Sequence, residues 1–256
     1  MATVVEAVGV ETDGAVARIT LRRPPLNILS IESLEELNRI LLGLRHEPEL
    51  RVLVLQAEGK AFSAGVSVED HLPGKAEAML ATFNETFRLL WGLACPVISA
   101  VQGPALGGGC ELACFADLVI ASESATFGQP EIKLGVFPPI AALHFPHRIG
   151  LHRTLQLVLT GDIISAREGE RIGLVDRVVP PAELSTAVDN AVAGFRARSA
   201  PALRLTKRAV LAGAGRGFEA GLEEMEVFFG ELMKTEDAAE GLRAFLEKRP
   251  PVWRHA

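Results

Sequence analysis

Two glutamates stand at the start of apolar segments, where a charged side chain is unexpected. Glu111 lies in ALGGGCELACFAD (residues 105–117), and Glu131 lies in FGQPEIKLGVFPP (residues 127–139), twenty positions further along the chain. Two carboxyl groups beside one apolar pocket can hold separate pKa values, so that one donates a proton while the other accepts one. We therefore expect the two carboxyl groups to face one water molecule and to act on it.

Each glutamate also has a purely structural interpretation. Glu111 is expected in the first turn of a helix, and Glu131 directly follows Pro130. The helix dipole favours an acid at such positions by about 0.3 to 1 kcal/mol. The dipole accounts for one acid at each helix start, but not for the two turns of small residues nearby.

These two turns could bind a developing negative charge. Gly107 to Gly109 follow the predicted strand PVISAV and precede the helical CELACFA, where backbone N–H groups lack partners within the helix. A second turn, GKAFSAGVSVEDH (residues 59–71), follows the predicted strand RVLVLQA. No P-loop lysine and serine follow the glycines, so a reacting carbonyl oxygen fits better than a phosphate. Taken singly, each turn is more simply a tight loop.

Composition limits the classes of function. The chain has 256 residues, 48% of them apolar, and a formal net charge of −6, which disfavours nucleic-acid and anionic-membrane partners. Its N-terminus has neither a basic segment nor a long apolar one, so we expect a cytoplasmic protein. The cysteines Cys95, Cys110 and Cys114 are expected to be reduced, buried thiols, and no metal site is expected because His144 and His147 lack further ligands at suitable spacing.

The patterning predicts an α/β core followed by helices. Asp13-Gly14 predicts a hairpin between VVEAVGV and AVARITL, and Ser30 is a plausible N-cap for a helix with leucines spaced three and four apart. Residues 76–93 form a second amphipathic run. After residue 181 only helical periodicity remains, so we expect a core over 1–181 and a helical subdomain over 182–256. Within the latter, the glycines of 212–217 predict a helix-breaking turn and no dinucleotide site.

Three segments resemble the signatures of the crotonase, or enoyl-CoA hydratase/isomerase, superfamily and occur in its order. They are KAFSAGVSV, VQGPALGGGCELACFADLVIAS and ATFGQPEIKLGVFP. The resemblance extends to RRPPLNILS (22–30), to residues 159–180 and to residues 234–251, and so covers nearly the whole chain. It implies a core built as a spiral of repeated ββα units, with a helical C-terminal oligomerisation subdomain.

The resemblance also implies a site and a substrate. The backbone N–H groups of Val66 and Gly108 would form an oxyanion hole for a thioester carbonyl, and the family's hydratases use two glutamates that match Glu111 and Glu131. Retention of both favours addition or removal of water. The resemblance implies contacts to coenzyme A from the following residues: Leu26, Asn27, Ile28, Lys60, Ala61, Phe62, Ala64, Phe245 and Lys248.

The family's partners are implied in the same way. A coenzyme A thioester would be the substrate, with no permanently bound cofactor, and the chain would form a homotrimer or a hexamer. Phe245 and Lys248 match a C-terminal pair that often reaches the ligand of a neighbouring subunit. Lys248 has an equally good interpretation as a solvated helix lysine.

Departures from the family pattern concern the acyl pocket. This chain has VSVEDH and VFPPIAALHF where many hydratases have ADIKE-like and IPGAGGTQRL segments. The expected acyl pocket therefore consists of Val136, Phe137, Pro138, Pro139 and Ile140. With AGVSVEDH, this wall looks most like that of the cyclohexa-1,5-diene-1-carbonyl-CoA hydratases of anaerobic aromatic-acid degradation, which implies 6-hydroxycyclohex-1-ene-1-carbonyl-CoA as the product.

Three alternatives remain open at this point. The first is a hydratase for another enoyl-CoA, or a 3-hydroxyacyl-CoA dehydratase. The second is an enoyl-CoA isomerase or decarboxylase on the same fold. The third is a non-enzymatic relative that binds acyl-CoA or RNA, which the acidic balance and the complete set of candidate catalytic groups disfavour.

Overall fold

A six-stranded sheet carries the apolar strands of the chain. The computed structural model describes residues 6–214 and 218–256, although not the side chains of residues 218, 219 and 223. The strands lie in the order β1-β2-β3-β4-β6-β9, and all neighbours are parallel except the antiparallel pair β1 and β2. Their bounds are Val8–Thr12, Val16–Leu21, Val52–Ala57, Val97–Val101, Leu118–Ser122 and Arg177–Val179.

A smaller sheet lies at the end of the first. It contains β5 (Ala105–Leu106), β7 (Thr126–Gly128) and β8 (Ile163–Ser165), with β5 parallel and β8 antiparallel to β7. Short strands that alternate with helices in this way form the mixed α/β core expected from the sequence.

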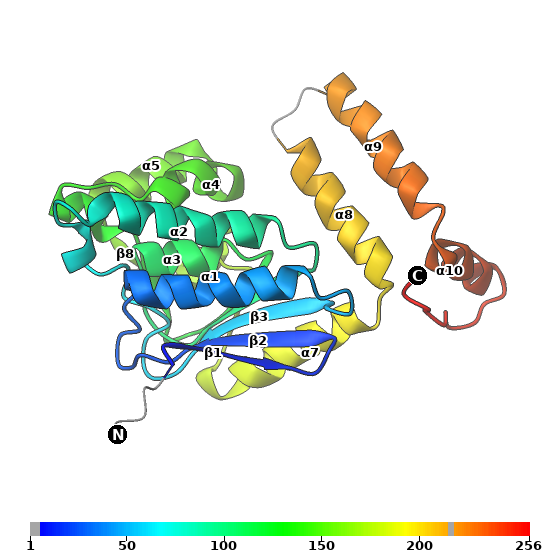
Figure 1. Cartoon of the computed structure of the whole chain (residues 1–256), viewed down its shortest axis with the longest axis horizontal. Helices are drawn as coiled ribbons and strands as arrows, with labels where there is room; N and C mark the ends of the chain where they lie inside the picture. Colours follow the sequence, from blue (N-terminus) through cyan, green and yellow to red (C-terminus); the bar gives the residue numbers. More distant parts are fainter. Residues whose placement is uncertain (1–5, 215–217) are drawn as a thin grey trace.

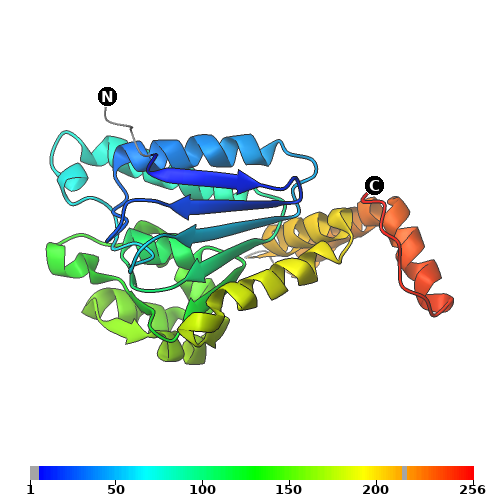
Figure 2. The same cartoon turned by 90° about the horizontal axis from the view of Figure 1, so that it is seen from below.

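Helices cover both faces of the six-stranded sheet. Helices α1, α2 and α3 lie over one face and α7 over the other, as Figures 1 and 2 show. Along β3, Leu53 and Leu55 belong to the larger apolar core, whereas Val52 and Val54 belong to the core beneath α7. The helix bounds are Ile31–Arg45 (α1), Ala76–Trp91 (α2), Gly108–Cys114 (α3), Pro139–Ile149 (α4), Leu151–Thr160 (α5), Ala166–Ile172 (α6), Leu184–Arg196 (α7), Ala200–Gly213 (α8), Phe218–Leu232 (α9) and Glu236–Leu246 (α10).

The local signals of the first hundred residues are confirmed. Asp13 accepts hydrogen bonds from Ala15 and Val16 in the predicted hairpin, where Gly14 has a φ of +84°. Ser30 caps α1 and exchanges hydrogen bonds with Ser33, and the four predicted leucines of α1 are buried. The start of the first predicted strand, at residues 4 and 5, lies outside the described residues.

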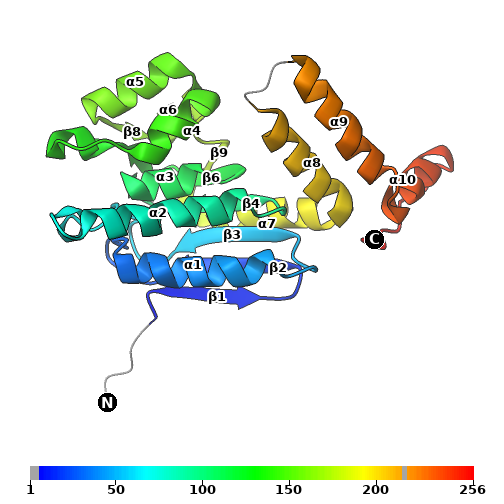
Figure 3. The same ribbon diagram turned by 45° about the horizontal axis from the view of Figure 1, so that its top comes forward.

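The C-terminal part is helical, as expected after β9, but it begins against the core. Helix α7 buries Ala187, Val188 and Val192 beneath the sheet, and α8 is still tied to the core, because Lys207 donates to the Cys95 carbonyl oxygen and to Asp117. Figure 3 shows α8 and α9 side by side and α10 beyond them; these three helices form the helical segment. A division at residue 181 into two domains stays a prediction. Part of the predicted turn, at residues 215–217, is not described.

Several further features bear on the expected class of protein. The three cysteines are free and buried, as expected. Within residues 6–214 and 218–256, no three histidine, cysteine or acidic side chains are grouped so that they could hold a metal ion. Over the same residues, no helix has the length and apolar character needed to span a membrane.

Asn27 ties together the two loops that lead into the candidate site. It is buried and holds a left-handed φ of 49°. Its side-chain amide donates to the carbonyl oxygens of Glu58 and Ala61, at 2.8 and 2.9 Å, while its own oxygen accepts from the Arg23 N–H. Its main-chain carbonyl accepts from the Ser63 hydroxyl. One side chain therefore fixes the start of the turn that follows β3.

We expect Asn27→Ala to lower the free energy of unfolding by about 3 kcal/mol, because it leaves buried main-chain groups unpaired and puts alanine at a left-handed φ. Urea unfolding followed by circular dichroism measures the loss. Asn190→Ala, at an exposed site on α7, is the control and should change stability by less than about 0.5 kcal/mol. Equal stability of the two variants would contradict the role given to Asn27.

Candidate active site

The two turns of small residues lie against one another. Ser63 and Ala105 form a parallel bridge, and the Leu106 N–H donates to the Ser63 carbonyl oxygen at 2.9 Å. A Cβ atom on Gly109 would collide with the Ser63 main chain, and one on Gly65 would lie 3.1 Å from the Leu106 carbonyl oxygen. Gly65 also has a φ of +110°. Glycine at these positions therefore allows the two turns to approach one another.

The candidate oxyanion donors face the space between these turns without competing partners. Leu29 pairs with the residues on either side of Val66, accepting from Ser67 and donating to Gly65. Gly108 is the first residue of α3, where the helix supplies no acceptor. Across the described parts of the chain, neither the Val66 N–H nor the Gly108 N–H donates to a protein acceptor. Both amides are free to receive a ligand oxygen.

Glu111 is held as a deeply buried acid in α3. It is 1% exposed, and its Oε1 accepts a hydrogen bond of 2.7 Å from the Ala141 N–H at the start of α4. Burial, together with the negative charge of Glu131, raises the pKa of Glu111 to about 8 against the opposing effect of the Ala141 and Ile140 N–H groups. Glu111 thus retains its proton near neutral pH.

Glu131 approaches the glycine turn from another element. It lies in the first turn of the 3-10 helix η2 (Pro130–Leu134), directly after β7, and is partly buried. A Cβ atom on Gly107, which has a φ of +52°, would lie 2.7 Å from Glu131 Oε1. The carboxyl group therefore rests on the peptide that precedes Gly108. Burial raises the pKa of Glu131 to about 7.

Together these groups can perform acid–base chemistry beside an anion-binding turn. Both carboxyl groups have raised pKa values, and the charge of Glu131 contributes to the raised pKa of Glu111. The two groups therefore exchange protons around neutral pH and titrate as a pair. Free N–H groups from two separate turns can stabilise an oxygen that becomes negative during a reaction. The acids are near this turn because β7 pairs with β5, where the Gly107 N–H donates to the Gly128 carbonyl oxygen.

The predicted coenzyme A residues fall into two groups. Asn27, Ala61 and Phe62 are buried, so their side chains support the loops and are closed to solvent. Leu26 and Lys60 are exposed, and Ile28 and Ala64 are half-buried. The Ala64 N–H donates to the Leu26 carbonyl oxygen at 2.8 Å, which places the two predicted segments side by side at the edge of the site.

Phe245 and Lys248 are not brought to this site within one chain. Helix α10 stands at the far end of the helical segment from α3, α4 and α5 in Figure 1. Phe245 is 81% exposed and Lys248 is also exposed, with a φ of 54°. Any contact between them and a ligand near Glu111 of the same chain would need a different arrangement.

The segment predicted as the acyl wall runs from η2 into α4. Pro138 and Ile140 are buried and Pro139 is half-buried, but Val136 is exposed and Phe137 is 70% exposed. A role that the sequence analysis missed belongs to Ala141, whose N–H holds Glu111. The signal was available, because two prolines that begin a helix are followed by N–H groups with no partner inside it.

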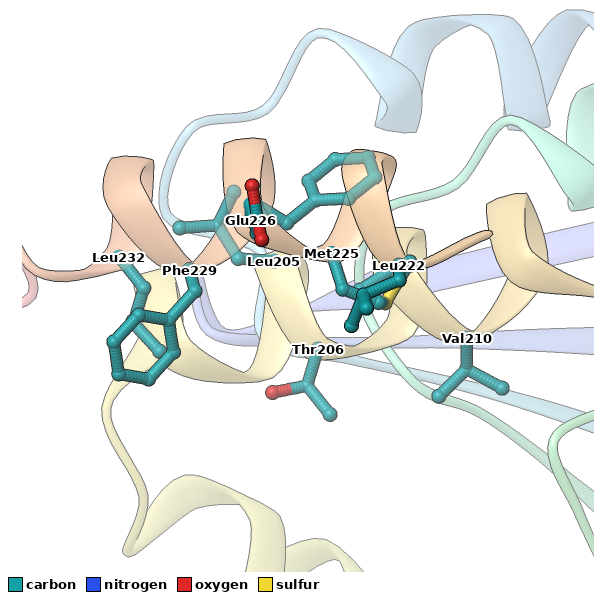
Figure 4. Close-up of a pocket in the computed structure, with 10 residues that line it drawn as sticks. Leu205, Thr206, Val210, Leu222, Met225, Glu226, Phe229 and Leu232 are labelled. Atoms are coloured by element: carbon teal, nitrogen blue, oxygen red, sulfur yellow. The ribbon is translucent and has the colours of Figure 1, made fainter. Parts of the chain in front are cut away.

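A separate apolar groove lies far from the glutamates. It has a volume of about 430 Å³ and lies between α8 and α9, where Leu205, Val210, Met225 and Phe229 line it (Figure 4). Among the residues whose side chains the structure describes, Glu226 is the one charged residue of its lining. The groove therefore belongs to the helical segment and contributes nothing to the acid–base site.

Comparisons with known proteins agree with this geometry. The model of the enoyl-CoA hydratase/isomerase family matches residues 11–256. A probable enoyl-CoA hydratase of Mycobacterium tuberculosis is 39% identical over 257 residues, covering 98% of each chain. The cyclohexa-1,5-dienecarbonyl-CoA hydratase of Thauera aromatica is 37% identical over 249 residues, covering 96% of this chain and 95% of that one.

A solved structure extends the comparison to three dimensions. The crystal structure of an enoyl-CoA hydratase from Bacillus anthracis superposes with a TM-score of 0.92 at 33% identity, covering 98% of this chain and all of the other. The fold, the order of the motifs and the family match over almost the full length point to one conclusion. The chain belongs to the enoyl-CoA hydratase/isomerase family.

Proposed function

We propose that this enzyme adds water to a conjugated coenzyme A thioester, with Glu111 and Glu131 sharing the water and the Val66 and Gly108 N–H groups binding the thioester oxygen. Its class is that of the hydro-lyases of the enoyl-CoA hydratase type. The observation that carries the proposal is the pair of buried carboxyl groups beside two unused N–H groups. The matched family and the hydratase names among the relatives support it.

In the proposed reaction, the two carboxyl groups transfer protons and the two N–H groups stabilise negative charge. Conjugation with the thioester makes the β-carbon electrophilic, and water attacks it while one carboxylate takes the proton of that water. The negative charge moves onto the thioester oxygen, where the two N–H groups stabilise it. A carboxyl group then donates a proton to carbon, so the reaction requires one acid and one base. Glu111 and Glu131 together supply both.

For the acyl group we propose cyclohexa-1,5-diene-1-carbonyl-CoA, converted to 6-hydroxycyclohex-1-ene-1-carbonyl-CoA. The wall VFPPIAA and the 37% identical Thauera aromatica protein support this choice. In such a diene the negative charge spreads over the extended dienolate, so protonation at its far end becomes possible. Buried Pro138 and Ile140 form part of a stiff wall beside Glu111 that is compatible with a flat ring.

A general enoyl-CoA hydratase, or a 3-hydroxyacyl-CoA dehydratase, is the second candidate. It is favoured by the 39% identical mycobacterial protein and by a short-chain-enoyl-CoA hydratase of Clostridium acetobutylicum, which is 36% identical over 247 residues. An isomerase or decarboxylase on this fold is the third, and retention of both glutamates argues against it. Oxygen from labelled water enters the product of a hydratase only.

We also propose a homotrimer or hexamer. The helical segment presents exposed apolar side chains, including Val210, Phe229 and Phe245, together with the groove between α8 and α9. A neighbouring copy would cover them, and its Phe245 and Lys248 would then reach a coenzyme A ligand. A cytoplasmic location, and the absence of nucleic-acid partners, remain predictions from the sequence.

Glu111→Gln and Glu131→Gln should each lower kcat by on the order of a hundredfold or more, since each removes one participant in proton transfer. Steady-state kinetics with an enoyl-CoA or dienoyl-CoA substrate measures the loss. Glu77→Gln, an exposed acid in the first turn of α2, is the matched control and should leave kcat unchanged. Full activity in either site variant would rule out the two-carboxylate mechanism.

The free energy of unfolding should fall as pH rises from about 5 to about 8, because folded Glu111 holds a proton that the unfolded chain has released. Glu111→Gln has no such proton and keeps an oxygen to accept from Ala141. The stability of the variant relative to the native chain should therefore grow with pH, by up to about 1.4 kcal/mol per pH unit. Urea unfolding at three pH values tests it; a constant difference refutes it.

Purified protein should turn over cyclohexa-1,5-diene-1-carbonyl-CoA more efficiently than crotonyl-CoA, as measured by kcat/KM with products resolved by chromatography and mass. The reason is the stiff wall next to Glu111. A preference for crotonyl-CoA would instead favour the general hydratase. If Glu131→Gln loses comparable activity toward both substrates, the same site acts on both.

A further inference from the structure

Gln129 is a polar side chain at the centre of the site for which the proposed chemistry has given no role. It links β7 to Pro130 and is fully buried, with an exposed fraction of 0%. With its amide nitrogen directed at Glu131, this nitrogen lies 3.1 Å from each carboxylate oxygen. The opposite orientation would set the amide oxygen against two acceptors, so hydrogen bonding assigns the nitrogen to this side.

The Glu131 carboxyl group lies between Gly107 and Gln129 in its contacts. Its Oε1 takes up the space that a Cβ atom on Gly107 would need, and the Gln129 amide nitrogen reaches both of its oxygens. An N–H donor stabilises the ionised form of a carboxyl group more than the protonated form, and so opposes the effect of burial. The same contact also restricts rotation of the Glu131 side chain and so fixes the direction of its carboxylate.

We infer that Gln129 is a positioning residue for Glu131, whose amide holds the carboxylate beside Gly107 and favours its ionised form. The catalytic consequence rests on the proposed function, whereas the placement and the effect on protonation do not. A buried amide with a backbone-only role would leave the titration of Glu131 unchanged, so the two possibilities differ in a measurable way.

Other charged or titratable groups surround Glu131 and must be considered. Glu111 faces it from α3 and is coupled to it electrostatically. Lys133 lies on the same segment, and helix α5, which packs against η2, carries His152 and Arg153. All four stay in place when only Gln129 is changed. A difference between the native chain and a Gln129 variant therefore reports on the amide.

The first test is the pH dependence of activity in Gln129→Met, which keeps the length of the side chain and removes the donor. We expect kcat to fall about tenfold with KM changed less than about threefold, and the limb that belongs to Glu131 to move up by about one pH unit. Gln56→Met is the matched control, because the Gln56 amide donates to Thr20 away from the glutamates. An unshifted profile in Gln129→Met would overturn the inference.

The second test needs no activity. Carbon-13 NMR of the glutamate carboxyl carbons, assigned with Glu131→Gln, gives the pKa of Glu131 directly. It should rise by about one unit in Gln129→Met and by more in Gln129→Glu, which keeps the shape of the side chain and replaces the donor with a second acid. Circular dichroism checks that each variant is folded.

The two tests separate failure of the inference from failure of the proposed function. An unchanged Glu131 pKa in both variants would overturn the inference, even if the enzyme hydrates its substrate as proposed. A raised Glu131 pKa in a protein that hydrates no coenzyme A thioester would support the inference and refute the function.

Discussion

The approach of one main-chain turn to another is the contact on which the rest of the site depends. Gly109 lies against the carbonyl oxygen and the side chain of Ser63, and Gly65 lies against the carbonyl oxygen of Leu106. Helix α3 therefore begins in contact with the turn that follows β3. Its first residue, Gly108, lies against the Val66 side chain of the second turn, and Glu111 follows one turn later in the same helix. A larger residue at either glycine would separate these groups.

Burial raises the pKa values of the two glutamates, and a hydrogen bond from helix α4 offsets part of the cost of burying Glu111. Glu111 has almost no contact with solvent, and its main polar support is the N–H of Ala141. One donor leaves the carboxyl group short of the stabilisation that water would give, so it keeps its proton to a higher pH. Glu131 is less buried and is correspondingly less shifted. The difference in environment separates two chemically identical groups.

Much of the fold could be predicted from short-range signals. Asp13-Gly14, the N-cap Ser30 and the leucines of α1 act within a few residues, and the structure contains each as expected. The partners of the Asn27 side chain and of the Ala141 N–H could not be predicted in this way, although the free N–H of Ala141 could. Asn27 acts on main-chain groups more than thirty residues away, and Ala141 reaches Glu111 only after α3 and α4 have packed. Sequence spacing carries no information about such contacts.

The candidate site residues also divide into those predicted from local sequence and those predicted from resemblance alone. The two glutamates and the two turns were found from residue type and position, because proline, glycine and acids have strong local preferences. Phe245 and Lys248 came from resemblance alone, and Figure 1 shows α10, the helix of Phe245, well away from α3, the helix of Glu111. Exposed apolar side chains lie on α8, α9 and α10, among them Val210, Phe229 and Phe245.

The groups that would hold the substrate oxygen are main-chain atoms, fixed by glycines and strand pairing. The side chains from Val136 to Ile140 belong to a different segment, but the main chain that follows them is tied to the site, because the Ala141 N–H donates to Glu111. Substitutions that change these side chains and leave that main chain in place would alter the shape of the expected acyl pocket while the two turns keep their contact. The proposed chemistry and the choice of acyl group would then change separately.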